Sequence, residues 1–281
     1  MKQAMIKKIT MPLIKDICLM LSVALFLFIV FLLPLSIKEQ LMLVYATPLS
    51  LGLFFTSFVH VDVMHFLGNL SFYLIFIFTI YMLAVSGKVK RDFYAMFFAA
   101  ILLLPLVLSV LDIVVMITLN LGGGRTYGFS GIDSFFLGVL PYFAIANFKR
   151  AWPESNMQTG SYVFLFFVMG SIALLFNAGV LILLLPWIFF FIFLALFLKP
   201  KWGEMKKGFD FFKSKPNKVV VCILLLVLLV LGSEIYGLFP SVIVRGDTRV
   251  DILTHYLGLA LGLFAGIFLS WHREKLLGIK K

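Results

Sequence analysis

The sequence is poor in charged residues and in cysteine. Only 13% of its 281 residues are charged and 62% are hydrophobic, whereas about a quarter of the residues in a soluble domain are charged. So few charged side chains could not cover a soluble surface of this size, which excludes a soluble or disordered protein and indicates an integral membrane protein. The two cysteines, Cys18 and Cys222, both lie inside long apolar runs, and this placement excludes a disulfide framework.

Long apolar runs predict the membrane spans. A spanning helix needs about 20 mostly apolar residues, so the run from Ser161 to Leu198 is too long for one helix, and Asn177-Ala178-Gly179 provides a turn near its middle. Dividing this run gives eight predicted spans: 13–34, 62–85, 93–120, 128–147, 161–176, 180–198, 219–238 and 251–270. We therefore predict an all-α polytopic membrane protein that forms a single transmembrane domain over residues 1–281.

The positions of lysine and arginine test this arrangement independently. With a cytoplasmic N-terminus, 20 of the 24 basic residues fall on the cytoplasmic side, and only Lys38, Arg125, Arg245 and Arg249 fall outside, as the positive-inside rule requires. We therefore expect a multi-pass protein of the cell membrane, embedded in the lipid bilayer with both termini in the cytoplasm. The net charge of +11 is explained by this topology, and we expect no nucleic-acid partner.

Polar residues inside the predicted spans are candidates for function, because they are costly in a membrane. His65 and Asn69 are four residues apart and share one face of the second span. His255 lies about one turn inside the last span, and Ser130 follows the glycine-rich stretch 122–128 at the start of the fourth. On the predicted topology these four side chains, from three helices, all lie in the outer part of the bilayer.

Small residues accompany two of these polar side chains. Gly258, Gly262 and Gly266 lie on the same helix face as His255, and Gly131, Ser134 and Gly138 form a similar stripe below Ser130. Such stripes allow helix backbones to approach closely, so we expect the imidazole to come within reach of the hydroxyl. The alternative interpretation is that both stripes are ordinary helix-packing motifs.

Three short motifs in this chain resemble those of the rhomboid family. Residues 58–69 resemble its H-x4-H-x3-N motif, Gly128-Phe129-Ser130-Gly131 resembles its G-x-S-G motif, and His255-Tyr256-Leu257-Gly258 with Gly262 resembles its H-x-x-G-x-x-x-G motif. They occur in the family's order and each stands at the expected end of its helix. The resemblance implies a six-helix rhomboid-like core, here with two additional transmembrane helices, and 219–238 would correspond to the family's substrate-gating helix.

The resemblance also implies an intramembrane serine endopeptidase that cleaves other membrane proteins in or near their transmembrane segments, without a metal or other cofactor. By matching positions, Ser130 is the nucleophile and His255 the general base of a catalytic dyad. The oxyanion-stabilising groups would be His65, Asn69 and the amide of Ser130. Four further residues match positions with a structural role near the site: His60, Gly128, Gly131 and Gly258.

Two other functions remain open at this stage. The chain could be a catalytically inactive rhomboid-like protein that binds client transmembrane helices, or a transporter in which Asp112, Asp133 and Glu234 line a path. A zinc site built from the histidines is disfavoured because the sequence has no H-E-x-x-H helix. Asp251 precedes His255 by four residues, and we interpret it as a cap of the last helix rather than as a third catalytic residue.

Overall fold

The structure, a computed structural model, describes residues 2–118, 124–151, 244–245, 248–249 and 252–276, and most of these are helical. The helices are α1 (Lys2–Phe31), α2 (Leu35–Leu41), α3 (Gly52–Phe55), α4 (Val63–Ser86), α5 (Lys90–Phe98), α6 (Leu104–Thr118), α7 (Ser130–Ala151) and α12 (Ile252–Leu276). A 3-10 turn at Thr56–Phe58 follows α3, and a π-helical turn at Ala99–Leu103 joins α5 to α6. The short strands are β1 (Leu43–Val44), β2 (Arg125–Thr126), β3 (Val244–Arg245) and β4 (Thr248–Arg249).

Four of the described helical stretches are long and apolar enough to cross a membrane. They are Leu13–Phe31, Val63–Ser86, Lys90–Thr118 and Leu253–Arg273. They coincide within a few residues with the predicted spans 13–34, 62–85, 93–120 and 251–270. The prediction of a helical membrane protein is thus confirmed for these four spans. The predicted spans 161–176, 180–198 and 219–238 lie outside the described residues, and the total of eight spans stays a prediction.

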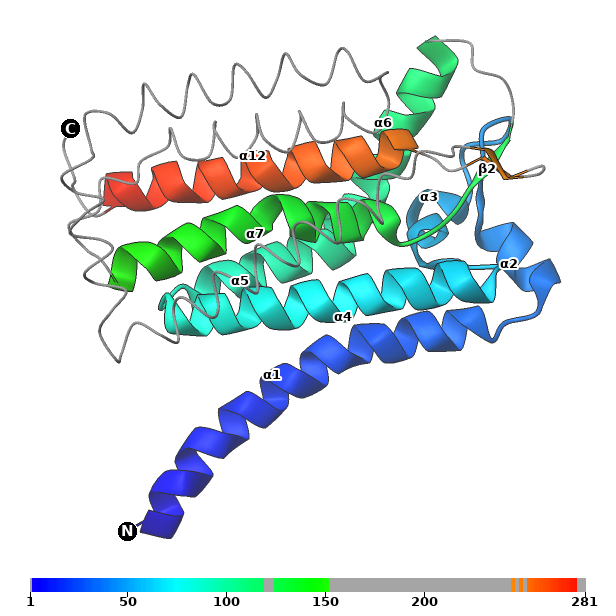
Figure 1. The fold of residues 1–281 in the computed structure, drawn as a ribbon. Coiled ribbons are helices and arrows are strands. Elements are labelled where there is room, and N and C mark those ends of the chain that lie inside the picture. The colour runs from blue at the N-terminus through cyan, green and yellow to red at the C-terminus, as the bar shows by residue number, and fades with distance from the viewer. Residues whose placement is uncertain (1, 119–123, 152–243, 246–247, 250–251, 277–281) are drawn as a thin grey trace.

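Helix α7 covers the remaining predicted span, 128–147, but it is not one of the four apolar stretches. The helix contacts α4 on one side and α12 on the other (Figure 1). Every residue from 129 to 143 is buried within the protein, including Asp133 and Ser134. A helix that is surrounded by other helices does not face lipid, so it can carry more polar residues than its neighbours.

The helices α4, α7 and α12 begin at the same end of the bundle. In Figure 1 each of them starts at the end of the bundle where α2, α3 and β2 lie, and runs toward the opposite end. The predicted site residues lie near the starts of these three helices: His65 and Asn69 in α4, Ser130 in α7 and His255 in α12. The arrangement of the helices therefore brings together the polar residues that the sequence places at one depth.

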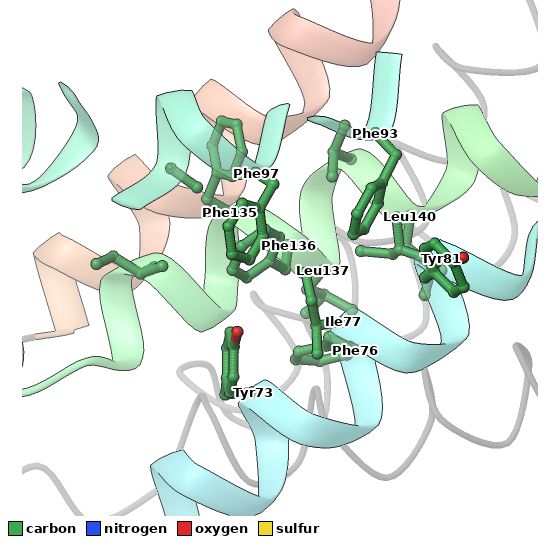
Figure 2. Packing of buried hydrophobic residues seen from close by; sticks show 14 of the residues in the cluster. Tyr73, Phe76, Ile77, Tyr81, Phe93, Phe97, Phe135, Phe136, Leu137 and Leu140 are labelled. Atoms are coloured by element: carbon green, nitrogen blue, oxygen red, sulfur yellow. The ribbon is translucent and has the colours of Figure 1, made fainter. Parts of the chain in front are cut away.

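An aromatic core joins α4, α5 and α7 (Figure 2). Tyr73 of α4 packs edge to face against Phe129, with ring centroids 5.6 Å apart, and Phe93 of α5 packs against Phe143 of α7 at 6.5 Å. The Tyr73 hydroxyl also donates a hydrogen bond of 2.7 Å to the carbonyl oxygen of Met20 in α1. In a membrane, such close packing and interhelical hydrogen bonds stabilise the bundle, because lipid is as apolar as the side chains.

Helices α7 and α12 contact each other through glycine. A Cβ atom added to Gly258 would clash with the carbonyl oxygen of Gly131, and one added to Gly262 would clash with that of Phe135. One added to Gly138 would clash with the carbonyl oxygen of Leu259 in the other helix. The predicted close approach of the two small-residue stripes is thus confirmed, and these glycines are required because the backbones touch.

The segment between α1 and α4, residues 32–62, folds back onto the start of α7, and we call it the first loop. Its strand β1 pairs antiparallel with β2, with Leu43 opposite Thr126 and Val44 opposite Arg125. The Tyr45 hydroxyl donates a hydrogen bond of 2.5 Å to Oδ2 of Asp112 in α6. The first loop therefore contacts both α6 and the residues that lead into α7, an arrangement that the sequence did not predict.

Polar contacts hold the helices together at the end opposite the first loop. Asp16 of α1 is buried, accepts hydrogen bonds from Tyr81 at 2.5 Å and from Tyr94, and forms an ion pair with Lys90. These contacts join α1 to α4 and α5. A buried carboxylate is costly in this environment unless it is paired, and Asp16 therefore fixes the position of α1 along its neighbours.

Candidate active site

The start of α4 is fixed by a side-chain cap. Asp62 precedes the helix, and its Oδ1 accepts a hydrogen bond of 2.8 Å from the backbone N–H of His65. Such a cap satisfies one of the free N–H groups in the first turn of a helix. The cap sets where α4 begins, and it therefore sets the direction in which His65 and, one turn later, Asn69 leave the helix.

The residues 124–129 before α7 form a tight bend, which we call the serine loop. Gly128 has φ +127°, a conformation that favours glycine. A Cβ atom added to it would lie 2.9 Å from Cε1 and 3.1 Å from Nε2 of His65, and 3.7 Å from Nδ2 of Asn69. The backbone two residues before Ser130 thus lies against both side chains that the sequence suggests as oxyanion donors.

His60 connects α4 to the serine loop through hydrogen bonds of its ring. Its ring is fully buried, and Nε2 accepts a hydrogen bond of 2.8 Å from Nδ2 of Asn69 and a longer one of 3.4 Å from the backbone N–H of Phe129. Because Nε2 accepts, the Asn69 amide is oriented with its nitrogen toward the site, where it can donate its second hydrogen. This contact gives His60 a physical role in orienting Asn69.

The protonation of His60 follows from its surroundings. Burial, together with the nearby His65, lowers the pKa of His60 well below its ordinary value. The backbone at Phe58 raises this pKa, but by less than burial lowers it. Nδ1 forms no hydrogen bond of normal geometry with a described residue. The imidazole is therefore neutral at physiological pH, which keeps Nε2 available as an acceptor.

Ser130 and His255 both lie just before a close contact between α7 and α12, each on its own helix. Ser130 is the first residue of α7, and Gly131, which follows it, would place an added Cβ 2.6 Å from Cγ2 of Thr254. His255 follows Thr254, and Gly258, one turn further along α12, lies against Gly131. Both side chains are at least nine-tenths buried. The two residues are thus held at the same level of two helices whose backbones touch.

A small polar cavity lies beside this pair. It is partly open to solvent and has room for about one water molecule. Its lining includes Gly128 of the serine loop and Thr254 of α12 together with polar groups of the first loop and α6, namely Thr56, Ser57, Ser109 and Asp112. Hydroxyl and carboxylate groups of this kind bind water, so the cavity can hold water beside Gly128, two residues before Ser130, and Thr254, which precedes His255.

The residues that the sequence suggests for the site lie in or just before the first two turns of α4, α7 and α12: His60, His65, Asn69, Gly128, Ser130, Gly131, His255 and Gly258. Comparison with protein-family models, curated proteins and solved structures finds no match to this chain. The assignment to the rhomboid family therefore depends on the three motifs, and it stays a prediction.

Sequence reasoning missed the contribution of the first loop. Thr56 and Tyr45 belong to no motif, yet Thr56 lines the cavity and Tyr45 donates a hydrogen bond to Asp112, another lining residue. Asp133, three residues after Ser130, is fully buried. Asp251 and Glu234 lie outside the described residues.

Proposed function

We propose that this protein is a rhomboid-like intramembrane serine endopeptidase in which Ser130 is the nucleophile and His255 the general base. The observation that carries the proposal is the glycine-mediated contact of α7 and α12, with Ser130 just before Gly131 and His255 one turn before Gly258. A serine hydroxyl is a weak nucleophile until a positioned imidazole accepts its proton. Two helices in backbone contact can hold the serine hydroxyl and the imidazole close enough for this proton transfer.

The first half of the reaction forms an acyl-enzyme. Oγ of Ser130 attacks the carbonyl carbon of the scissile peptide, its proton passes to His255, and the carbonyl oxygen becomes an oxyanion. The tetrahedral intermediate then breaks the C–N bond, and His255 returns the proton to the leaving amine. The acyl group remains on Ser130 as an ester, as in other serine hydrolases.

Three groups are available to stabilise the oxyanion: the N–H of Ser130 at the start of α7, the His65 side chain and the free hydrogen of the Asn69 amide. The contact of Gly128 with both side chains supports this assignment, because it places them beside the serine loop. The Ser130 N–H stands in the first turn of α7 and has no acceptor within that helix. In a preorganised, buried site, loss of one such donor costs about 10²- to 10³-fold in rate.

The second half of the reaction needs water inside the membrane. His255 removes a proton from a water molecule, whose oxygen attacks the ester carbonyl, and the proton then passes to Oγ as the acid product leaves. The polar cavity between Gly128 and Thr254 is a source for this water. On the expected topology the site lies toward the outer face, and the substrates are transmembrane segments of other membrane proteins.

Labelling with a fluorophosphonate probe in detergent tests this proposal. Oγ of Ser130 would attack phosphorus and displace fluoride, so the wild type should be labelled and Ser130→Ala should not. His255→Ala should be labelled about 10²- to 10⁴-fold more slowly. Ser134→Ala is a matched control, because it removes another buried hydroxyl from α7 one turn below Ser130 and should be labelled like the wild type.

The same proteins are then incubated with a single-span membrane protein that carries a helix-destabilising residue near its outer end. The wild type and Ser134→Ala should cleave it, and Ser130→Ala and His255→Ala should not. A folded wild-type protein that is neither labelled nor able to cleave would refute the proposed activity.

A further inference from the structure

We propose that Thr56 is a positioning residue for the nucleophile, because it fixes the backbone of the serine loop two residues before Ser130. This inference rests on the proposed function and deepens it, since it names a residue that acts on Ser130 without touching substrate. Thr56 lies in the 3-10 turn of the first loop and its side chain is buried.

Thr56 makes two hydrogen bonds that join the first loop to the serine loop and a third within the first loop. Its hydroxyl donates to the carbonyl oxygen of Thr126 and accepts a hydrogen bond of 3.1 Å from the backbone N–H of Leu43. Its own carbonyl oxygen accepts a hydrogen bond of 3.0 Å from the N–H of Gly128. The bonds to Thr126 and Gly128 hold the backbone on both sides of Tyr127.

The serine loop needs such a restraint because of its glycine. Gly128 has no Cβ and can adopt many backbone conformations, so its φ of +127° must be imposed by contacts rather than by its own preference. Thr56 holds the residues on the N-terminal side, and Nε2 of His60 contacts the N–H of Phe129 at 3.4 Å on the other side. If the bonds from Thr56 were lost, the serine loop could move and displace the N–H and Oγ of Ser130. The positions of these groups must be accurate to about 0.5 Å for catalysis.

A second role for the Thr56 hydroxyl must be separated from this one. Thr56 also lines the polar cavity, so its removal could reduce the supply of water. Water enters only when the acyl-enzyme is hydrolysed, whereas the position of Ser130 matters when the acyl-enzyme forms. Reaction with a fluorophosphonate uses no water in its first step, and its rate therefore reports the geometry around Ser130 and not the supply of water.

The experiment compares Thr56→Val and Thr56→Ser with the wild type. Valine keeps the shape and removes the hydroxyl, whereas serine keeps the hydroxyl and removes the methyl group. Ser57→Ala is the matched control: it removes a buried hydroxyl from the same wall of the cavity but leaves the three bonds of Thr56 intact. For each protein we would measure the rate constant of fluorophosphonate labelling, kcat and KM for the single-span substrate, and the thermal unfolding midpoint in detergent.

Thr56→Val removes both hydrogen bonds of the hydroxyl, but only the bond to Thr126 holds the serine loop. Loss of one such bond corresponds to roughly a tenfold change in rate. We expect Thr56→Val to lower the labelling rate and kcat by about this factor with KM within about twofold, whereas Thr56→Ser and Ser57→Ala label at the wild-type rate. If Thr56→Val does not fold, Thr56→Cys, which retains only a weak donor, should label more slowly than Thr56→Ser.

Three results would overturn the inference while leaving the proposed protease intact. These are wild-type labelling by Thr56→Val, equal labelling by Thr56→Cys and Thr56→Ser, and a loss of kcat in Thr56→Val that Ser57→Ala reproduces without any change in labelling. A folded wild-type protein that is not labelled at all would overturn the proposed function, and the role of Thr56 with it.

Discussion

Gly258 of α12 lies against the carbonyl oxygen of Gly131 in α7, so closely that no side chain fits between the two helices. This contact lies within one turn of both Ser130 and His255, and any atom inserted there must separate the helices that carry them. Stability and the geometry of the proposed dyad therefore depend on the same glycines.

Gly258→Ala is accordingly expected to lower both stability and activity. Overpacking of a tight contact costs about 1–3 kcal/mol, and the displacement of α12 would also move His255 away from Ser130. Gly68→Ala is the matched control, because a Cβ added to Gly68 of α4 meets no atom within 4 Å. The measurements are the denaturation midpoint in detergent and the rate of fluorophosphonate labelling. Equal midpoints for the two variants would show that the glycine contact is not needed.

Gly128→Ala is expected to abolish most of the activity with a smaller effect on stability. Alanine at φ +127° is strained, and its Cβ would lie within about 3 Å of the His65 ring, so the serine loop and the ring must both move. Loss of oxyanion donors predicts a decrease in labelling of about 10²- to 10³-fold. Gly124→Ala, in the same loop, meets no atom within 4 Å and should be labelled normally. A Gly128→Ala protein as reactive as Gly124→Ala would contradict the site geometry.

The neutral state of His60 predicts a dependence of stability on pH. In the unfolded chain a histidine has a pKa of about 6.5, whereas burial lowers the pKa of His60 in the folded protein. As the pH falls below about 6.5, the unfolded chain binds a proton that folded His60 does not, so the free energy of unfolding decreases by at most about 1.4 kcal/mol per pH unit. His60→Gln retains an acceptor but cannot titrate.

The free energy of unfolding should therefore fall more steeply between pH 7 and pH 5 in the wild type than in His60→Gln. Denaturant titrations of both proteins at several pH values provide the comparison. Parallel pH profiles would mean that His60 takes up its proton equally in the folded and unfolded states.

The sequence was informative where a local pattern has a direct physical meaning. Apolar runs located four of the described helices, because a membrane requires about 20 apolar residues in a row. The spacing of Gly258 and Gly262 predicted the contact with α7, because small residues three or four positions apart lie on one helix face. The order of the motifs placed His65, Asn69, Ser130 and His255 at one end of the bundle.

The first loop was not predictable in the same way. Strands β1 and β2 have two residues each and are separated by the whole of α4, α5 and α6, so no periodicity reveals their pairing. The bonds of Thr56 end on backbone atoms of residues 43, 126 and 128, and backbone atoms have no sequence signature. Asp112 was recognisable as a buried acid, but its partner Tyr45 is 67 residues away.

The contacts of Asp16 at the far end of the bundle give a test of stability that is separate from the proposed chemistry. Asp16→Asn removes the charge that pairs with Lys90 and weakens the bonds from Tyr81 and Tyr94, which should cost about 1–3 kcal/mol. Lys90→Met should also destabilise the protein, and the double variant should cost less than the sum of the two, since each removes the same ion pair. Denaturation midpoints in detergent measure this coupling, and additive costs would show that the pair contributes nothing. At a temperature where all variants are folded, fluorophosphonate labelling should be unchanged, because α1 contributes no residue to the proposed site.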